Sequence, residues 1–215
     1  MKIQIENHEV NWLANSIVEK LSNTEEQHKI LVTTFPFLTT KDIDQLLNIS
    51  EYRCYQNKEK IVRSGENARK TFFTLKGMLR GYFVNKKGEE KNIFLRPEHT
   101  LTGAPESLFQ NKPTKYTFEA ILETHLLIYN FNDFQELAAE NPRINNLYIK
   151  GLQENIQTLI GRVEMMIDKS PEERYEELLK RSPQFFQTAF NKHIANYLGI
   201  TPVSLSRIIR RKSNQ

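Results

Sequence analysis

Cysteine is nearly absent from this chain of 215 residues, in which Cys54 is the only one. A single cysteine excludes an internal disulfide and an iron–sulfur cluster held by the chain's own cysteines. Long apolar runs are missing as well: no stretch of about 18 apolar residues occurs, and the first residues have no signal-peptide pattern. We therefore expect a cytoplasmic protein that has no membrane partner.

Constellations typical of enzymes are also lacking. The five histidines, at positions 8, 28, 99, 125 and 193, are scattered, and the sequence has neither a phosphate-binding glycine loop nor a nucleophile paired with a base. No ligand spacing typical of a metal site occurs. We predict no catalytic residue, no metal site and no enzymatic activity; an enzyme is the weaker alternative.

Acidic residues are absent from one long segment. Residues 188–215 contain no Asp or Glu, whereas the whole chain has 26 of them against 30 Lys and Arg. The cations of this segment are Lys192, Arg207, Arg210, Arg211 and Lys212. A cationic face attracts phosphates and releases their counterions. The segment is therefore a candidate nucleic-acid-binding surface, although a solvated basic face on a pair of helices would have the same composition.

The same segment has the pattern of a helix-turn-helix. Ile194 and Leu198 share one helical face, and Gly199 follows as the residue that ends the helix, because glycine adopts the left-handed conformation without a Cβ penalty. Thr201 can cap the next helix, and Pro202 suits its first position. The second helix has an apolar face of Leu205, Ile208 and Ile209, and an outward face of Val203, Ser204, Ser206, Arg207 and Arg210.

Short apolar or alternating runs occupy the region between residues 51 and 129. We predict strands at residues 52–55, 60–62, 71–75, 78–84, 92–95, 116–122 and 126–129. Turn signals separate them at residues 64–67, 76–77 and 86–88. This pattern is typical of an all-β sandwich or barrel, which can hold a ligand between its layers.

Helical patterns flank the β region. One amphipathic helix is expected around residues 10–21, with Trp12 alongside, and a second from about Thr40, with Asp42 in its first turn. Asn132 and Asp133 can cap a short helix that runs to residue 140. Further along, Ser170 caps a helix that opens the C-terminal domain, and the stretch before residue 192 leaves room for a reduced β wing or none.

Pro142 begins a long helix with a heptad pattern. Its apolar residues at alternating steps of three and four are Ile149, Leu152, Ile156, Leu159, Val163 and Met166. Such a pattern predicts that the helix pairs with its copy in a second subunit. The alternative is burial on the chain's own β region, which Leu147, Ile160 and Ile167 would support.

The segment from Ile194 to Ile208 resembles the DNA-reading segment of the Crp/Fnr superfamily of bacterial transcription regulators. The resemblance rests on Ile-Ala, Leu-Gly-Ile-Thr-Pro and Leu-Ser-Arg-Ile at the offsets that this family uses. It implies that Arg207 contacts guanine through both ends of its guanidinium, that Val203 faces bases, and that Pro202 stands where many members have Arg. Ser206 belongs to the same predicted surface, and the residues expected to touch phosphates are Thr201, Ser204, Arg210 and Arg211.

The β region resembles the cyclic-nucleotide-binding β-roll of the same superfamily, with glycine-marked turns at 61–66 and 73–80 and a phosphate-binding cassette at 103–120. Members that bind cyclic AMP have Glu after the cassette glycine and Arg-Ser further on, where this chain has Ala104, Thr114 and Lys115. Thr114 carries no charge for a phosphate, and lysine lacks the arginine fork. We expect no cofactor and no dependence on cyclic AMP. The candidate pocket for another effector comprises Gly103, Ala104, Ser107, Thr114 and Lys115.

The resemblance covers about residues 28–211 and implies an α+β fold: a double-sheet β-roll of jelly-roll type, a long dimerisation helix and a helix-turn-helix domain of winged-helix-like type. We divide the chain into a helical extension (1–27), a β-roll sensor domain (28–131), a helical connector with the dimerisation helix (132–168) and a DNA-binding domain (169–215). We predict a homodimeric transcription regulator whose partners are double-stranded DNA, its own copy and RNA polymerase. The rival hypothesis is a cyclic-nucleotide-responsive module whose tail binds protein.

Overall fold

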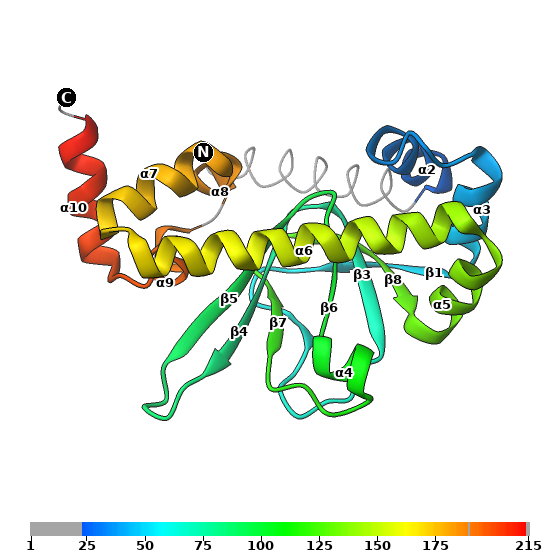
Figure 1. The fold of residues 1–215 in the computed structure, drawn as a ribbon, viewed down its shortest axis with the longest axis horizontal. Helices are drawn as coiled ribbons and strands as arrows, with labels where there is room; N and C mark the ends of the chain where they lie inside the picture. The colour runs from blue at the N-terminus through cyan, green and yellow to red at the C-terminus, as the bar shows by residue number, and fades with distance from the viewer. Residues whose placement is uncertain (1–22, 189, 214–215) are drawn as a thin grey trace, which may run out of the picture.

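A computed structural model describes residues 23–188 and 190–213 of the chain. A β-roll lies beneath one long helix, with the C-terminal helices at one end of that helix and the N-terminal helices at the other (Figure 1). One antiparallel sheet has the strand order β1 (Ser50–Tyr55), β8 (Thr124–Asn130), β3 (Lys70–Lys76) and β6 (Leu101–Gly103). The other has the order β2 (Lys60–Val62), β7 (Thr117–Ala120), β4 (Met78–Val84) and β5 (Glu90–Pro97).

Each predicted strand is present, and the α+β architecture with a β-roll is confirmed. Aromatic side chains fill the space between the two sheets: the Phe118 ring lies 6.0 Å from that of Phe94 and 6.2 Å from that of Phe72, between ring centroids. Phe72 and Phe118 are fully buried. Because large rings bury much apolar area and pack in offset or tilted pairs, they hold the two layers together.

Two short elements of the β-roll were not predicted. Strand β6 and helix α4 (Pro105–Gln110) lie between β5 and β7. Each is too short for its periodicity to be read from the sequence. Asn111, in the left-handed conformation at φ 52°, ends α4.

Two helices precede the β-roll, α2 (Thr24–Thr34) and α3 (Thr40–Asn48). The sequence prediction missed α2 but gave α3 correctly: Thr39 caps it in a capping box with Asp42. Asp42 also joins α3 to the long helix, because its carboxylate accepts from Arg143 Nε at 2.5 Å, which keeps the pKa of this carboxyl well below its usual range. The helix expected at 10–21 lies outside the described residues.

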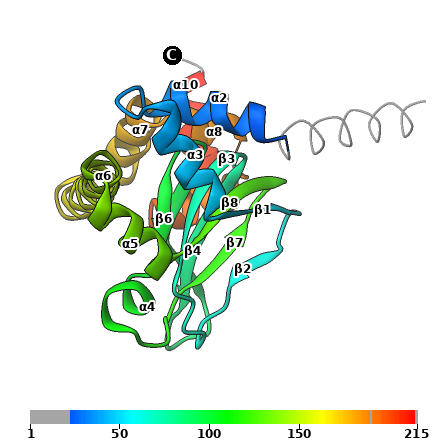
Figure 2. The same cartoon turned by 90° about the vertical axis from the view of Figure 1, so that its right-hand side faces the viewer.

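Two helices follow the β-roll, α5 (Phe131–Glu140) and α6 (Pro142–Asp168). The predicted start of α6 at Pro142 is confirmed. The predicted caps of α5, Asn132 and Asp133, are wrong: Asn130 caps the helix and accepts from the Asn132 amide at 2.9 Å. The helix begins earlier because Phe131 is buried directly after β8. Figure 2 looks nearly along α6 and shows it beside β6.

The C-terminal part is helical, with α7 (Pro171–Arg181), α8 (Gln184–Thr188), α9 (Asn191–Tyr197) and α10 (Pro202–Ser213). Ser170 caps α7 and forms a capping box with Glu173, so the predicted cap of this helix is confirmed. Within residues 169–188 and 190–213 no strand occurs, in line with the expectation of a reduced wing or none. Among the described helices, none has both the length and the apolar character needed to cross a bilayer.

Candidate DNA-binding surface and effector pocket

The turn between α9 and α10 has the geometry that the sequence predicts. Gly199 adopts φ +71°, and a Cβ at this position would lie 2.7 Å from the Met166 methyl carbon of α6. The Thr201 hydroxyl accepts from the Ser204 amide at 3.1 Å and so caps α10. The turn therefore needs glycine for its backbone conformation and packs closely on α6.

The inner faces of α9 and α10 form a small core with α7. The residues of the two helices and the turn between them that are at most 3 % exposed are Ile194, Ala195, Leu198, Leu205 and Ile208. The Tyr175 and Phe185 side chains pack into the same cluster. This burial fixes the angle between the two helices, so that α10 turns its other side to solvent.

The outer face of α10 brings most of the predicted DNA-binding residues together. Five of them line one shallow hollow: Pro202, Val203, Ser206, Arg207 and Arg210. Val203 is 60 % exposed although it is apolar, and Thr201 is exposed next to this face while Ser204 is half-buried. In the described part of the chain no ion pair involves Arg207 or Arg210, so both guanidinium groups are available to a ligand.

Arg211 lies apart from this group. It forms an ion pair with Glu172 of α7, and its neighbour Lys212 forms one with Glu176. The structure thus places Arg211 on the side of α10 that faces α7, because a step of one residue turns a helix by about 100°. The acid-free segment 188–215 is therefore not free of ion pairs, because α7 supplies two carboxylates to Arg211 and Lys212.

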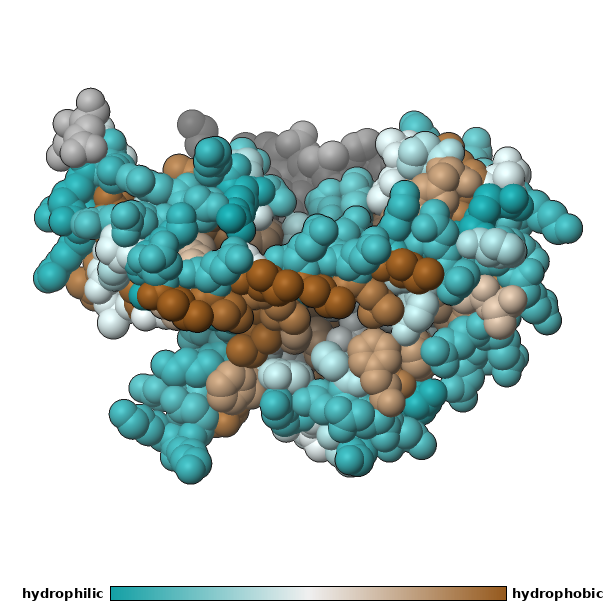
Figure 3. Space-filling view, in the orientation of Figure 1, coloured by the Kyte–Doolittle hydropathy of each residue, from teal (hydrophilic) through white to brown (hydrophobic). Residues whose placement is uncertain are grey.

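Helix α6 carries an exposed apolar stripe, which Figure 3 shows along its length. Of the six predicted dimer residues, Ile149, Ile156 and Val163 are 43 %, 55 % and 56 % exposed. The other three, Leu152, Leu159 and Met166, are half-buried. The structure therefore leaves one edge of the predicted seam without cover from the described residues of its own chain.

The alternative of a helix buried on its own β-roll is correct for only part of α6. Leu147 is buried in the core around α5, as that alternative requires. Ile160 and Ile167, which were expected to support it, are 53 % and 81 % exposed and extend the apolar stripe. They point outward because they follow Ile156 and Val163 by one helical turn.

The candidate effector residues lie around α4. Ala104 and Ser107 are fully buried, and the Ser107 hydroxyl donates to the Lys112 carbonyl at 3.1 Å. A Cβ on Gly103 would lie 2.6 Å from the Leu108 Cδ1 atom. The region around Gly103 is thus closely packed, and little room is left beside the cassette glycine.

A carboxylate stands where the cassette would need donors for a phosphate. Glu106 accepts from the Thr114 hydroxyl at 3.1 Å and pairs with Lys115 Nζ at 3.8 Å, so it engages the polar atoms of both residues. The Ala104 side chain offers no acceptor for a ribose hydroxyl. An anion would meet the negative charge of Glu106 and compete for its partners, so these residues do not fit a cyclic nucleotide.

An apolar hollow of about 390 Å³ lies between α4, β6 and α6. Leu101, Phe109 and Leu159 are among the side chains that line it, and Phe109 is 55 % exposed. Its lining also includes Leu152 and Ile156 of the α6 stripe. The hollow is therefore continuous with the surface on which a second subunit is expected.

Arg162 of α6 connects the C-terminal helices with the β-roll, which the sequence analysis missed. Its guanidinium donates to the Ile93 carbonyl of β5 at 3.1 Å and to the Tyr197 carbonyl of α9 at 2.9 Å. The guanidinium carbon lies 4.2 Å from the centroid of the Tyr197 ring. A single arginine within a heptad pattern gives no sequence signal for this role, because both acceptors are backbone atoms from other elements.

Comparison with known proteins identifies a nucleotide-binding type of domain and relatives that are regulators. The family model of the cyclic nucleotide-binding domain matches residues 52–141. Electron transport regulator A of Shewanella oneidensis is 24 % identical over 190 residues, which cover 82 % of this chain and 75 % of that protein. Regulatory protein HlyX of Actinobacillus pleuropneumoniae is 25 % identical, with 82 % of this chain and 78 % of that protein covered.

Among solved structures, FixK2 from Bradyrhizobium japonicum matches with a TM-score of 0.67 at 16 % identity, over 78 % of this chain and 86 % of that one. The relatives are regulators by name and not enzymes, in agreement with our prediction of no enzymatic activity. The match to FixK2 extends over most of both chains and so supports the fold of β-roll, long helix and C-terminal helices described above. Residues 52–141 match the cyclic nucleotide-binding domain, and most of the chain is similar to regulators of the Crp/Fnr superfamily.

Proposed function

We propose that this protein is a sequence-specific DNA-binding transcription regulator of the Crp/Fnr type, which works as a homodimer in the cytoplasm together with RNA polymerase. The observation that carries the proposal is the outer face of α10, where Arg207 and Arg210 are exposed beside Val203 and form no ion pair with any described residue. A helix with a short, cationic outer face fits the major groove of DNA. The regulators to which the chain is similar support the same function.

Within the groove, the side chains of this face would have separate roles. Arg207 would donate both ends of its guanidinium to O6 and N7 of a guanine, and Val203 would contact a thymine methyl group. Thr201 and Arg210, at the two ends of the face, would contact phosphates and position the helix. Arg211 would reach a phosphate only after releasing Glu172, so we expect it to contribute less than Arg210.

A dimer follows from the requirements of the site. One recognition helix reads few base pairs, and two helices related by a two-fold axis read two half-sites about one helical turn apart. The exposed stripe of α6 supplies a surface for that pairing, since its apolar side chains lose their contact with water when two copies meet. The regulator would bind a palindromic operator.

Cyclic AMP would not be the effector. A phosphate near α4 would meet the Glu106 carboxylate, which already accepts from Thr114 and pairs with Lys115. Leaving these polar groups without partners costs about 1–3 kcal/mol each, more for a charged group. We expect the purified protein to bind DNA with the same affinity whether or not cyclic AMP is added.

The test is capture of genomic DNA fragments by the purified protein at near-physiological salt, with sequencing of the retained DNA. We expect a two-fold symmetric site. Arg207→Ala should lose about 1–3 kcal/mol of affinity for that site, or about 5- to 150-fold, and Arg207→Lys should keep the charge but not the base preference.

Arg63→Ala is the matched control, because Arg63 is an exposed arginine of the β-roll. It should bind the captured site like the natural chain. Capture of no preferred sequence, with or without cyclic AMP, would refute the function. Full base preference in Arg207→Ala would refute the assignment of base reading to this residue.

A further inference from the structure

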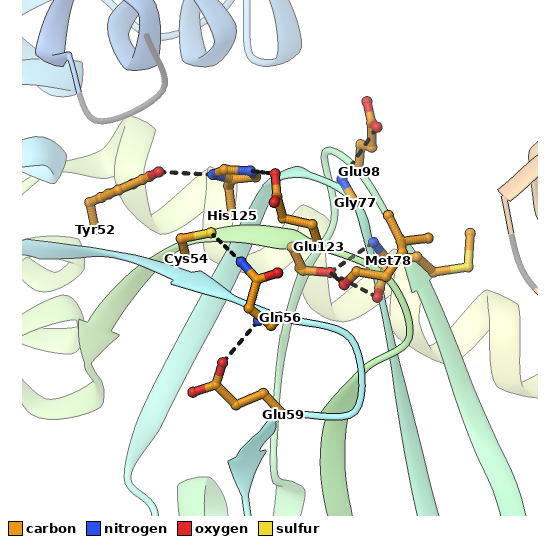
Figure 4. Close-up of polar contacts among 11 residues, drawn as sticks. Tyr52, Cys54, Gln56, Glu59, Gly77, Met78, Glu98, Glu123 and His125 are labelled. Carbon is orange, nitrogen blue, oxygen red and sulfur yellow. Dashed lines mark hydrogen bonds and ion pairs between the residues drawn. The ribbon is translucent and has the colours of Figure 1, made fainter. Parts of the chain in front are cut away.

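Three side chains with metal-binding atoms meet at one end of the β-roll, although they are far apart in the sequence. Cys54 of β1 is the direct cross-strand partner of His125 of β8. Glu123 precedes His125 by two residues, so its side chain points to the same side. One donor atom from each residue lies within 4.8 Å of the other two. Figure 4 shows the three side chains converging.

The His125 ring is fixed in orientation. It is fully buried, its Nε2 atom lies 3.0 Å from Glu123 Oε1, and its Nδ1 atom lies 2.8 Å from the Tyr52 hydroxyl. Tyr52 and Cys54 are two residues apart in β1, so their side chains point to the same face of the sheet, which is also the face of His125. A histidine that binds a metal through one ring nitrogen commonly hydrogen-bonds a second-shell group through the other, and Tyr52 is placed for that role.

We propose that Cys54, Glu123 and His125 form a binding site for a divalent transition metal of the Zn²⁺ type. Sulfur, imidazole nitrogen and carboxylate oxygen are the three ligand types that zinc uses in proteins. Zinc bond lengths in a tetrahedron place ligand atoms about 3.3–3.7 Å apart. The His125 and Glu123 atoms are already 3.0 Å apart, so it is the Cys54 sulfur, within 4.8 Å of them, that needs to approach by about 1 Å. Three protein ligands leave the fourth position open to water or to an exogenous ligand.

The electrostatics of the cluster favour a cation. The Glu123 carboxylate lies within 4.8 Å of the Cys54 sulfur, so a Cys54 thiolate and this carboxylate would repel each other in the absence of a positive charge. A divalent cation between them turns this repulsion into attraction. Cys54 and Glu123 are both half-buried, which gives an ion a path from solvent.

The site also borders the DNA-binding domain. The turn before Glu123 contains Ile121 and Leu122, which pack into the cluster formed by the C-terminal helices. The Thr124 hydroxyl accepts from the Met78 amide at 3.2 Å, which ties the same turn to β4. A metal bound by Glu123 and His125 would fix this turn. The metal site goes beyond the proposed function and does not depend on it.

The experiment is titration of the metal-free full chain with Co²⁺ and, by competition with a chromophoric chelator, with Zn²⁺. Cys54 is the only cysteine, so a thiolate-to-cobalt charge-transfer band can come from no other residue. We expect that band in the natural chain and its loss in Cys54→Ser. Zinc affinity should fall by more than about 100-fold in Cys54→Ser and Glu123→Gln, and by about 10-fold in Tyr52→Phe, since second-shell partners are worth 10- to 100-fold.

Glu98→Gln is the matched control, because Glu98 is an exposed carboxylate at the same end of the β-roll. Among the residues drawn in Figure 4, its carboxylate contacts only the Gly77 amide. It should keep both the band and the affinity. Zn²⁺ should raise the Tm of the natural chain and of Glu98→Gln but not of Cys54→Ser. Absence of the charge-transfer band, or equal zinc affinity in the natural chain, Cys54→Ser and Glu123→Gln, would overturn the site. Circular dichroism of each variant with chelator verifies that it is folded.

Discussion

The side-chain oxygen of Asn196 accepts the backbone N–H of Asn92 at 2.7 Å, which attaches the first helix of the helix-turn-helix to strand β5 of the same chain. The contact is reciprocal, because the Asn92 amide group donates to the His193 carbonyl at 3.1 Å and that of Asn196 donates to the Glu90 carbonyl at 2.7 Å. Figure 1 shows α9 near β5 below the end of α6. The position of the recognition helix is therefore set by the β-roll as well as by α6.

Replacing this asparagine should loosen the DNA-binding domain without unfolding the β-roll. Asn196→Ala leaves the buried N–H of Asn92 without its partner, which costs about 1–3 kcal/mol. Hydrogen exchange should become faster across α9 and α10 and stay the same in β3 and β8. Asn191→Ala, an exposed position on the same helix, is the control. Equal exchange in both variants would show that the contact does not hold the domain.

Gly→Ala substitutions at two turns can separate the energetic cost of the left-handed backbone from the cost of a steric clash. Gly199 and Gly88 have φ values of +71° and +78°, but only Gly199 has a neighbour that a methyl group would meet, namely Met166. Gly88→Ala should lower the free energy of unfolding by about 1–2 kcal/mol through the left-handed conformation alone. Gly199→Ala should lower it by more, as measured by urea unfolding. Equal losses would mean that Met166 moves aside at no cost.

Local signals in the sequence were sufficient for much of the fold and for the recognition helix. Gly199, Thr201 and Pro202 act through their own backbone conformation and neighbouring amides, so their roles do not depend on the rest of the molecule. The alternation of strands and turns in the β-roll is likewise local. Short elements such as α4 and β6 have too few residues to show a period.

Contacts between distant segments account for what the sequence could not indicate. Arg211 has the charge of a phosphate-binding residue, but Glu172 of another helix binds it. Cys54 and His125 become neighbours only because β1 pairs with β8, a choice of strand order that neither strand encodes alone. A scattered set of histidines therefore does not exclude a ligand cluster.

The stability of the protein should depend on pH through His193. Burial lowers the pKa of His193 to about 4, aided by the charges of Arg80 and Lys192 and opposed by Glu90. This histidine stays neutral in the folded chain while it takes up a proton below about pH 6.5 when unfolded. The folded state then binds fewer protons, so stability falls as the pH drops from about 6.5 towards 4.

Urea unfolding at pH 7.5 and pH 5.5 measures this effect, because the ordinary pKa of histidine lies within that range and those of Asp and Glu lie below it. The loss of stability between the two pH values should be smaller in His193→Gln than in the natural chain. The comparison isolates His193, since the remaining histidines are common to both proteins. An unchanged pH dependence in His193→Gln would contradict the assignment.

We expect the exposed apolar stripe of α6 to be the interface of the dimer. Ile156 lies near the middle of the stripe and is 55 % exposed. In a dimer its side chain would be buried against the partner helix, so Ile156→Glu would place an uncompensated charge in an apolar interface, at a cost of about 3–5 kcal/mol. We expect the dimer dissociation constant to rise by at least about 100-fold in sedimentation equilibrium.

Thr158→Glu provides the control on the same helix. Thr158 is exposed, and two residues of α-helix turn it by about 200° away from Ile156, so its charge would remain in solvent. This variant should stay dimeric and keep its affinity for a palindromic site, whereas Ile156→Glu should bind a palindrome no better than a half-site. If both variants dimerise equally well, α6 is not the interface, and the apolar stripe must be covered by another surface.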